Sequence, residues 1–495
     1  MVSSRTTRGM RTAQGRGAAL VLVGVLLASG CSDGEAQTPS VDPAALADAV
    51  QIDTLMARLS DLERIANDNG GNRAVGTPGY DASVDYVVAA LEGAGFEVET
   101  PEFDTTGFTV DREALTVDGA PLEVRALGMS PSTGPDGVSA RVVRVPTDDT
   151  PGCEATDYDG LDAAGAVVIV DRGECTFADK ERIAAEQGAV ALLAVNSEEG
   201  PLAAATLGDE AEPRIPVGGV AREDGDRLAA ASTVTLTLET RTETVTSRNV
   251  VAQTRTGATD NVVVVGAHLD SVPDGPGIND NGSGSVAVLE TALQLGAEPD
   301  VQNAVRFAFW GAEEVGLVGS SRYVDSLSEE ERLDIALYLN FDMLGSPNPG
   351  YLVFDGDDSD GVGAGPGPEG SAGIERTFAT FFADRGIAVD GTDFDGRSDY
   401  GPFVDVGIPA GGVFSGADDT KSDEQAGKWG GTAGEPFDPN YHKAEDTVAN
   451  IDRDAYAIAA AAVAYGTGVY ALSLDGPDGV PTGEERVRAR AEFTE

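Results

Sequence analysis

Histidine is scarce in this chain, and the positions of its two copies give the first chemical signal. The 495 residues contain only His268 and His442. His268 follows an apolar run and precedes Asp270, and His442 lies in the acidic segment 441–446. Imidazole together with carboxylate is a typical ligand set for zinc. A lone histidine on a strand is more often structural, but confinement to these two acidic positions favours a metal site.

Carboxylates follow three apolar segments that are predicted as strands, residues 261–266, 305–310 and 336–341. A predicted helix, residues 284–295, lies between the first two, and this alternation favours a largely parallel sheet covered by helices. Ligands bind at the carboxyl ends of the strands in such sheets. The side chains that we expect to meet there are His268, Asp280, Glu313, Glu314 and Asp342.

The charge balance excludes one class of partner. The chain has 33 basic and 84 acidic residues and a net charge of −51, a field that repels nucleic acid phosphates and anionic lipids. We therefore expect no nucleic acid partner.

The first 30 residues read as a targeting segment. Four arginines precede an apolar stretch, residues 18–28, that is too short to span a bilayer. The following Ala28–Cys31 resembles a bacterial lipoprotein signal, which implies that Cys31 is lipidated and that the membrane is contacted only through this anchor. The alternative is an ordinary signal peptide cleaved near Ser29. Either reading takes the protein out of the cytoplasm.

The remaining cysteines form an even pair. With Cys31 assigned to the lipid, Cys153 and Cys175 remain in an oxidising compartment. We expect one disulfide between them.

Between about residues 130 and 240 the sequence predicts short strands around one helix, residues 177–187. Within this region, segment 171–177, with Lys180 and Asn196, resembles the protease-associated domain. The resemblance implies a small β-rich, non-catalytic insert, and the alternative is a β spacer without a role of its own.

Seven motifs then occur in one order, at residues 268–271, 277–284, 310–314, 340–350, 396–399, 428–434 and 441–442. Together they resemble the secreted double-zinc leucine aminopeptidases of peptidase family 28, the glutamate carboxypeptidase-like metallopeptidases. The resemblance implies the zinc-dependent exopeptidase fold and two zinc ions per chain. It assigns one ion to His268, Asp280 and Asp342, and the other to Asp280, Glu314 and His442.

The resemblance also implies catalytic roles. Adjacent side chains point apart, so only one of Glu313 and Glu314 should bind metal, and by resemblance Glu313 is the general base. Asp270 should accept the second ring N–H of His268, unless it only caps a turn. Tyr441 corresponds to the group that binds the oxyanion, unless it is merely packed there.

Three further residues are expected to bind substrate. By resemblance, the backbone carbonyl of Arg397 holds the substrate amine together with Glu313 and Asp342. Met343 and Phe414 fall where the family lines its apolar specificity pocket, although either could belong to the core.

The sequence departs from the family pattern in two places. Asn440 and Glu445 stand where a disulfide brackets the Tyr-His motif in the family members considered, so we expect a more mobile loop. Tyr400 replaces a histidine that is not a zinc ligand, so the site should survive.

The sequence thus predicts a lipid-anchored, monomeric zinc aminopeptidase that acts on peptides with large apolar N-terminal residues. Alternatives are a carboxypeptidase or glutaminyl-cyclase-like relative on the same fold and, more remotely, a non-catalytic binding protein. The predicted segments are a signal (1–30), a tether (31–45), the peptidase domain (46–127 and 246–475), the protease-associated domain (128–245) and a disordered tail (476–495).

Overall fold

The computed structural model describes residues 41–147, 150–197, 200, 202, 205–208 and 212–493. The predicted signal segment and Cys31 lie outside the described residues. Helix α1 (Pro43–Ala49) starts within the predicted tether, because the Asp42 side chain accepts the backbone N–H groups of Ala44 and Ala45 and caps the helix. The fold therefore begins before residue 45.

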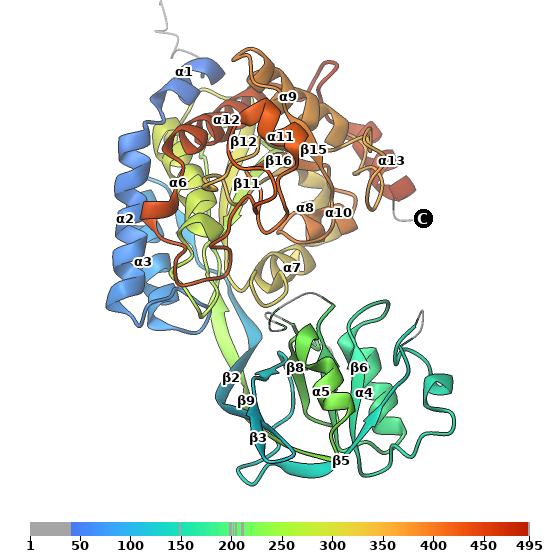
Figure 1. Ribbon diagram of the computed structural model, residues 1–495. Coiled ribbons are helices and arrows are strands. Elements are labelled where there is room, and N and C mark those ends of the chain that lie inside the picture. Colours follow the sequence, from blue (N-terminus) through green and yellow to red (C-terminus); the bar gives the residue numbers. More distant parts are fainter. Residues whose placement is uncertain are drawn as a thin grey trace, which may run out of the picture. The chain divides into compact units, whose positions relative to one another are not determined.

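A mixed sheet forms the centre of the peptidase domain (Figure 1). The strand order in this sheet is β1 (Val98–Glu99), β10 (Val250–Gln253), β12 (Asn303–Trp310), β11 (Ala258–His268), β13 (Ile335–Phe341), β16 (Ala410–Phe414), β14 (Leu352–Phe354) and β15 (Asp390–Thr392). Strands β12, β11, β13 and β16 pair in parallel, whereas β10 and β14 pair antiparallel to this central group. The predicted largely parallel sheet is confirmed.

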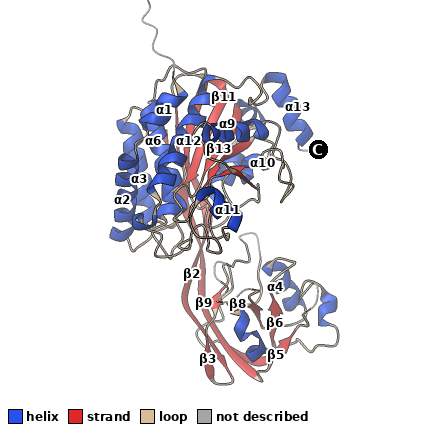
Figure 2. Cartoon of the chain, turned by 45° about the horizontal axis from the view of Figure 1, so that its top comes forward, coloured by secondary structure: helices blue, strands red, loops and turns tan. Residues whose placement is uncertain are grey.

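Alternate side chains of the central strands face two separate core layers. Val263 and Val265 of β11 pack with residues of helices α2 (Ile52–Asp68), α3 (Pro78–Gly93), α6 (Gly284–Leu295) and α12 (Arg453–Leu472). Val262 and Val264 pack instead with residues of α7 (Val318–Ser326) and α10 (Gly401–Asp405). Helices lie on both sides of the strands in Figure 2.

Helix α6 matches its predicted extent, and both α6 and α12 are buried for most of their length. In α6 only a few side chains reach the surface, because the helix packs between the sheet and other helices. Helix α12 has a window of mean hydropathy 1.4 and is long enough to cross a membrane, but 67% of that window is buried. Its place in the core accounts for its apolar composition.

The second sheet belongs to the inserted domain. The strand order there is β3 (Ala120–Leu122), β2 (Glu102–Val117), β9 (Thr233–Arg248), β5 (Val138–Arg144), β6 (Val167–Asp171), β7 (Ala191–Val195), β8 (Val217–Val220) and β4 (Arg125–Ala126). Helix α4 (Phe177–Glu186) and the short α5 (Gly225–Ala229) accompany these strands. The expected disulfide joins Cys153 to Cys175.

The second sheet starts earlier in the chain than predicted. Strands β2, β3 and β4 fall within residues 46–127, which we assigned to the peptidase domain, but they pair in the second sheet. Strand β2 pairs antiparallel with β9 from Glu102 opposite Arg248 to Val117 opposite Val234. This long ladder joins two strands that are far apart in the sequence, so the local sequence pattern did not reveal their pairing.

The predicted disorder of residues 476–495 is wrong for most of that segment, because helix α13 (Gly483–Phe493) forms there. Arg486 donates to the carbonyls of Asp260 and Leu333, and Arg490 donates to those of Arg332 and Ile335. The charged composition suggested disorder, but two buried arginines on one helix face anchor the segment to the peptidase domain. Such long-range bonds leave no local signal.

Candidate active site

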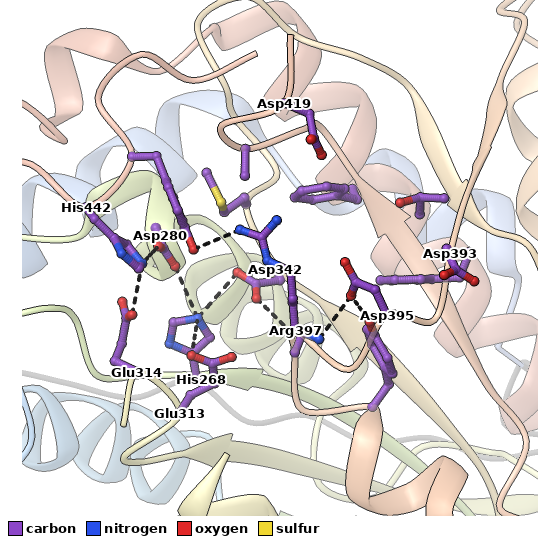
Figure 3. A pocket seen from close by; sticks show the side chains of 18 residues that line it. His268, Asp280, Glu313, Glu314, Asp342, Asp393, Asp395, Arg397, Asp419 and His442 are labelled. Atoms are coloured by element: carbon purple, nitrogen blue, oxygen red, sulfur yellow. Dashed lines mark hydrogen bonds and ion pairs between the residues drawn. The ribbon is translucent and has the colours of Figure 1, made fainter. Parts of the chain in front are cut away.

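The predicted site side chains lie together at the carboxyl ends of the central strands of the first sheet (Figure 3). Strand β11 ends at His268, opposite Trp310 at the end of β12. Strand β13 ends one residue before Asp342. The turn η3 (Ile278–Ser283) carries Asp280, and His442 reaches the same place from the loop after helix α11 (Asp423–Trp429).

Asp280 lies between the two histidines. Its Oδ1 is 3.2 Å from Nε2 of His268, and its Oδ2 is 3.2 Å from Nε2 of His442. Asp342 Oδ1 lies 3.4 Å from Nε2 of His268, and Glu314 Oε2 lies 3.0 Å from Nε2 of His442. The side chains thus form two clusters that share one carboxylate.

Glu313 and Glu314 face different histidines, as their adjacency predicted. Glu313 Oε2 is 3.9 Å from Nε2 of His268. The turn that separates the two glutamates from β12 passes through Ala312, whose φ of 59° is left-handed. Burial, with Asp399 and Glu314 nearby, holds the pKa of Glu313 well above its usual range. A carboxylate in such surroundings is suited to accepting a proton at neutral pH.

The donor set fits a divalent cation. Burial opposes a charge on His268, but the carboxylates of Asp342 and Glu313 raise its pKa well above the usual range. The same negative field attracts a metal ion. Asp342 Oδ1 and Glu314 Oε1 are buried and have no hydrogen-bond partner. Since a buried polar atom normally has a partner, and since the set combines imidazole with carboxylate, zinc is the ion that these residues suit.

Asp270 lies beside His268, and its carboxylate has further partners. The Nδ1 atom of His268 lies 3.2 Å from the backbone carbonyl of Asp270, whereas the nearest carboxylate oxygen is 3.7 Å away. The carboxylate instead accepts the backbone N–H groups of Glu313 at 3.1 Å and Glu314 at 3.3 Å. The ring nitrogen Nδ1 of His268 therefore faces both the backbone carbonyl and, farther away, the carboxylate of Asp270. Asp270 therefore holds the glutamate turn.

The expected substrate-binding residues line one cavity together with the histidines (Figure 3). Arg397 donates to Asp418 at 3.0 Å and to the Tyr441 hydroxyl at 3.4 Å. The Tyr441 ring stacks on His442 at 3.8 Å between centroids. Met343 and Phe414 also line this cavity, although Met343 is largely buried.

The site assembles without a histidine at position 400. The Tyr400 hydroxyl donates to Asp395 at 2.7 Å, and its ring contacts Phe354 at 4.8 Å between centroids. The preceding Ser398 donates to Asp342 Oδ2 at 2.8 Å. This segment therefore orients a candidate ligand through a serine, and Tyr400 packs beside it.

The loop that carries Tyr441 and His442 is held by two buried aspartates. Asp446 accepts the backbone N–H groups of Asn279 at 2.7 Å and Asp280 at 3.0 Å. Asp438 accepts the side-chain amide of Asn279 at 2.6 Å. The loop therefore has polar attachments on both sides of His442, in the place of the disulfide that we found missing.

Several residues of the site carried no recognised signal in the sequence. Besides Asp438 and Asp446, they include Arg73, which contacts the loop after His268, and a group of cavity-lining residues: Phe354, Thr392, Asp393, Asp395, Ala417 and Asp419. Apart from Phe354 at the end of β14, the cavity residues precede the 396–399 motif or follow β16. Most of them lie within a few residues of a motif or of a predicted site residue, and this proximity is the signal that the sequence offers for them.

The fold and this site define a metal-dependent exopeptidase, and comparison with known proteins gives the family. Residues 249–467 match the model of peptidase family M28, and residues 138–228 match that of the PA domain. The chain is 53% identical over 482 residues to the probable lipoprotein aminopeptidase LpqL of Mycobacterium tuberculosis, covering 95% of this chain and 96% of the relative. The chain therefore belongs to peptidase family M28, with an inserted PA domain.

Other relatives are also named aminopeptidases. An aminopeptidase of Pseudomonas aeruginosa is 43% identical, with 87% of this chain and 83% of the relative covered. Leucine aminopeptidase 2 of Trichophyton tonsurans is 38% identical, with 91% and 90% covered. The aminopeptidase from Aneurinibacillus sp. strain AM-1 has a TM-score of 0.71 at 27% identity, with 87% and 95% covered.

A further similar structure is that of a protein described as a zinc enzyme, BSAP, a zinc aminopeptidase from Bacillus subtilis. Its TM-score is 0.65 at 25% identity, with 87% of this chain and 97% of that chain covered. The protein is a metalloaminopeptidase, and the predicted family and activity are confirmed.

Proposed function

We propose that this aminopeptidase binds two zinc ions per chain and that Asp280 bridges them. One observation carries the proposal: each carboxylate oxygen of Asp280 lies 3.2 Å from Nε2 of a different histidine. His268 and Asp342 complete one ligand set, and His442 and Glu314 complete the other. Ions held there would lower the pKa of a water molecule and polarise the scissile carbonyl group.

Glu313 is the general base in this proposal. Its carboxylate takes a proton from the attacking water and delivers it to the leaving amine. The Tyr441 hydroxyl donates a hydrogen bond to the oxyanion that develops on the carbonyl oxygen. Because Arg397 donates to the Tyr441 oxygen, the hydroxyl proton remains available for the substrate. Asp270 acts indirectly, by holding the backbone of Glu313 and Glu314.

The substrate is a peptide with a free N-terminus. Its ammonium group lies between the carboxylates of Glu313 and Asp342 and the backbone carbonyl of Arg397, and a blocked amine would leave these groups without a cationic partner. Met343 and Phe414 surround the first side chain. Leucine, methionine and phenylalanine are therefore preferred over aspartate and glutamate, which the net charge of −51 also repels.

We further propose that the mature protein is a monomer anchored on the outer face of the cell membrane through Cys31. The lipoprotein name of the Mycobacterium tuberculosis relative supports the anchor. Mass spectrometry of the mature chain should find a diacylglycerol group on Cys31, and a soluble product that starts at another residue would reject this part of the proposal.

Chromogenic anilides test the activity. Leucine p-nitroanilide should be cleaved, a chelator should stop cleavage, and added zinc should restore it. N-acetyl-leucine and glutamate anilides at the same ionic strength should have much lower kcat/KM values. Comparable rates on free and acetylated leucine would contradict the amine site, and cleavage only of N-blocked peptides from their carboxyl end would favour the carboxypeptidase alternative.

A further inference from the structure

Arg73 is a fully buried cation outside the proposed ligand set. It lies in the turn-rich segment between α2 and α3, and its exposed fraction is 0%. Its guanidinium group donates to three backbone carbonyls: to Pro276 from Nε at 2.9 Å, to Gly277 from Nη2 at 2.5 Å, and to Leu269 from Nη1. One side chain therefore holds both ends of the loop 269–277.

This loop joins two residues of the active site, since His268 precedes it and Asp280 follows it closely. The Arg73 backbone also pairs with the loop. Its N–H donates to Ser271 Oγ at 2.9 Å, and its carbonyl accepts the N–H of Ser271 at 3.3 Å. The loop is thus folded around Arg73 through both main chain and side chain.

Gly277 permits this close wrapping. Its φ is 60°, and a Cβ atom there would lie 2.4 Å from both the Asp280 carbonyl oxygen and Ser271 Cβ. Only glycine adopts this conformation at so close an approach without displacing its neighbours. The carbonyl that Gly277 presents to Arg73 and the backbone of Asp280 are therefore fixed relative to each other.

The charge of Arg73 also suits this position. Burying a guanidinium group is costly, and burial lowers the pKa of Arg73. The carboxylates of Asp270, Asp446, Asp280 and Glu314 offset part of that cost through their electrostatic attraction. Each of the three guanidinium nitrogens donates to a backbone carbonyl, so the positive charge attracts these carboxylates from a fixed point.

We propose that Arg73 is a positioning residue that fixes the separation of His268 and Asp280 and so shapes the metal site before any ion binds. The inference depends on the two-metal function proposed above. Residues that orient ligands typically change metal affinity by about 10- to 100-fold when they are lost. A residue that served only overall stability would leave the affinity of the folded protein unchanged.

Cobalt(II) is the probe for this role, because its visible spectrum reports ligand geometry without any measurement of activity. Metal-free wild type, Arg73→Lys and Arg73→Met are titrated with cobalt(II) against a competing chelator. The matched control is Arg58→Met, since Arg58 is a partly buried arginine of the same domain that pairs with Glu290 at 2.8 Å. Circular dichroism verifies folding.

Arg73→Met should bind cobalt about 10- to 100-fold more weakly than wild type and show an altered spectrum. Arg73→Lys keeps the charge but cannot reach three carbonyls at once, so its cobalt affinity should lie between those of wild type and Arg73→Met. If Arg73→Met fails to fold, Arg73→Lys provides the test. The control should bind like wild type. Wild-type affinity and spectrum in the folded Arg73 variants would overturn the inference, even with lowered melting temperatures. Failure of wild type to bind two cobalt ions would reject the two-metal proposal itself, and the inference with it.

Discussion

The two histidines of the site are held in different ways. His268 ends a central strand, and its side chain is 1% exposed, whereas His442 lies on a loop with its side chain 24% exposed. The sheet and Arg73 fix the first. Stacking on Tyr441 and the hydrogen bonds of Asp438 and Asp446 fix the second.

One half of the site therefore forms with the core, while the other half depends on a few polar bonds. Central strands open only with global unfolding, whereas loops open locally at lower free energy. We therefore expect changes near His268 to affect both clusters, and changes near His442 to affect mainly the cluster that contains His442.

Removing the shared carboxylate should have the largest effect, because Asp280 belongs to both halves. Asp280→Ala should lose both zinc ions and lower kcat/KM by more than about 10³-fold, measured with leucine p-nitroanilide and by atomic emission. Asp274→Asn, an exposed position in the preceding loop, is the control and should retain both. An Asp280→Ala protein with two zinc ions would end the bridging assignment.

Removal of the Tyr441 hydroxyl tests chemistry on the loop half. Tyr441→Phe keeps the ring that stacks on His442 and should lower kcat by about 10²-fold, the usual cost of one oxyanion donor, with zinc content unchanged. Tyr351→Phe, whose ring contacts Phe382 and Trp429, should leave kcat unchanged. A Tyr441→Phe variant with wild-type kcat would show that this tyrosine is merely packed there.

Loosening the loop should produce a smaller and selective effect. Asp446 accepts two backbone N–H groups, and Asp446→Asn can accept only with its single carbonyl oxygen. We expect about tenfold weaker binding of the zinc ion on the His442 side, measured by competition with a chelator. The other ion should be weakened less, because Asp446 also holds the backbone of the shared Asp280. Asp454→Asn on helix α12 is the exposed control. Equal weakening of both ions would contradict the division into two halves.

The pH dependence of metal-free protein should give the smallest effect. Burial opposes a charge on His442, but Asp280 and Glu314 raise its pKa to about 10. A raised histidine pKa contributes stability that is complete below about pH 6.5 and is lost as the pH rises toward 10.

The melting temperature of metal-free protein should therefore decrease as the pH is raised from 6.5 to 10. The increase in melting temperature caused by zinc should become larger over the same range, because ligand histidines must be deprotonated. Differential scanning calorimetry at fixed ionic strength measures both. A zinc-dependent increase that is the same at both ends of this range would contradict the linkage.

The sequence predicted the parts of the molecule that local patterns encode. The apolar runs before His268 and Asp342 identified strands, and helix α6 has the predicted limits. The structure brings all of the predicted ligands together.

Contacts between a side chain and a distant backbone were not predictable in this way. Arg73, Asp438 and Asp446 act through carbonyls or N–H groups far along the chain, and any loop sequence supplies those groups. The same reason explains why the sequence did not show the bonds of Asp270 to Glu313 and Glu314, and why the prediction for helix α13 was wrong. The partners of these charged side chains are backbone groups.

The zinc content of the two glutamate variants tests the central claim most directly, because adjacent residues are assigned opposite roles. Glu313→Ala should keep both ions and lose about 10²- to 10⁴-fold in turnover, whereas Glu314→Ala should lose zinc from the His442 half. Atomic emission on purified, folded protein gives the answer. Equal loss of zinc from both variants, or two ions retained in Glu314→Ala, would contradict the account.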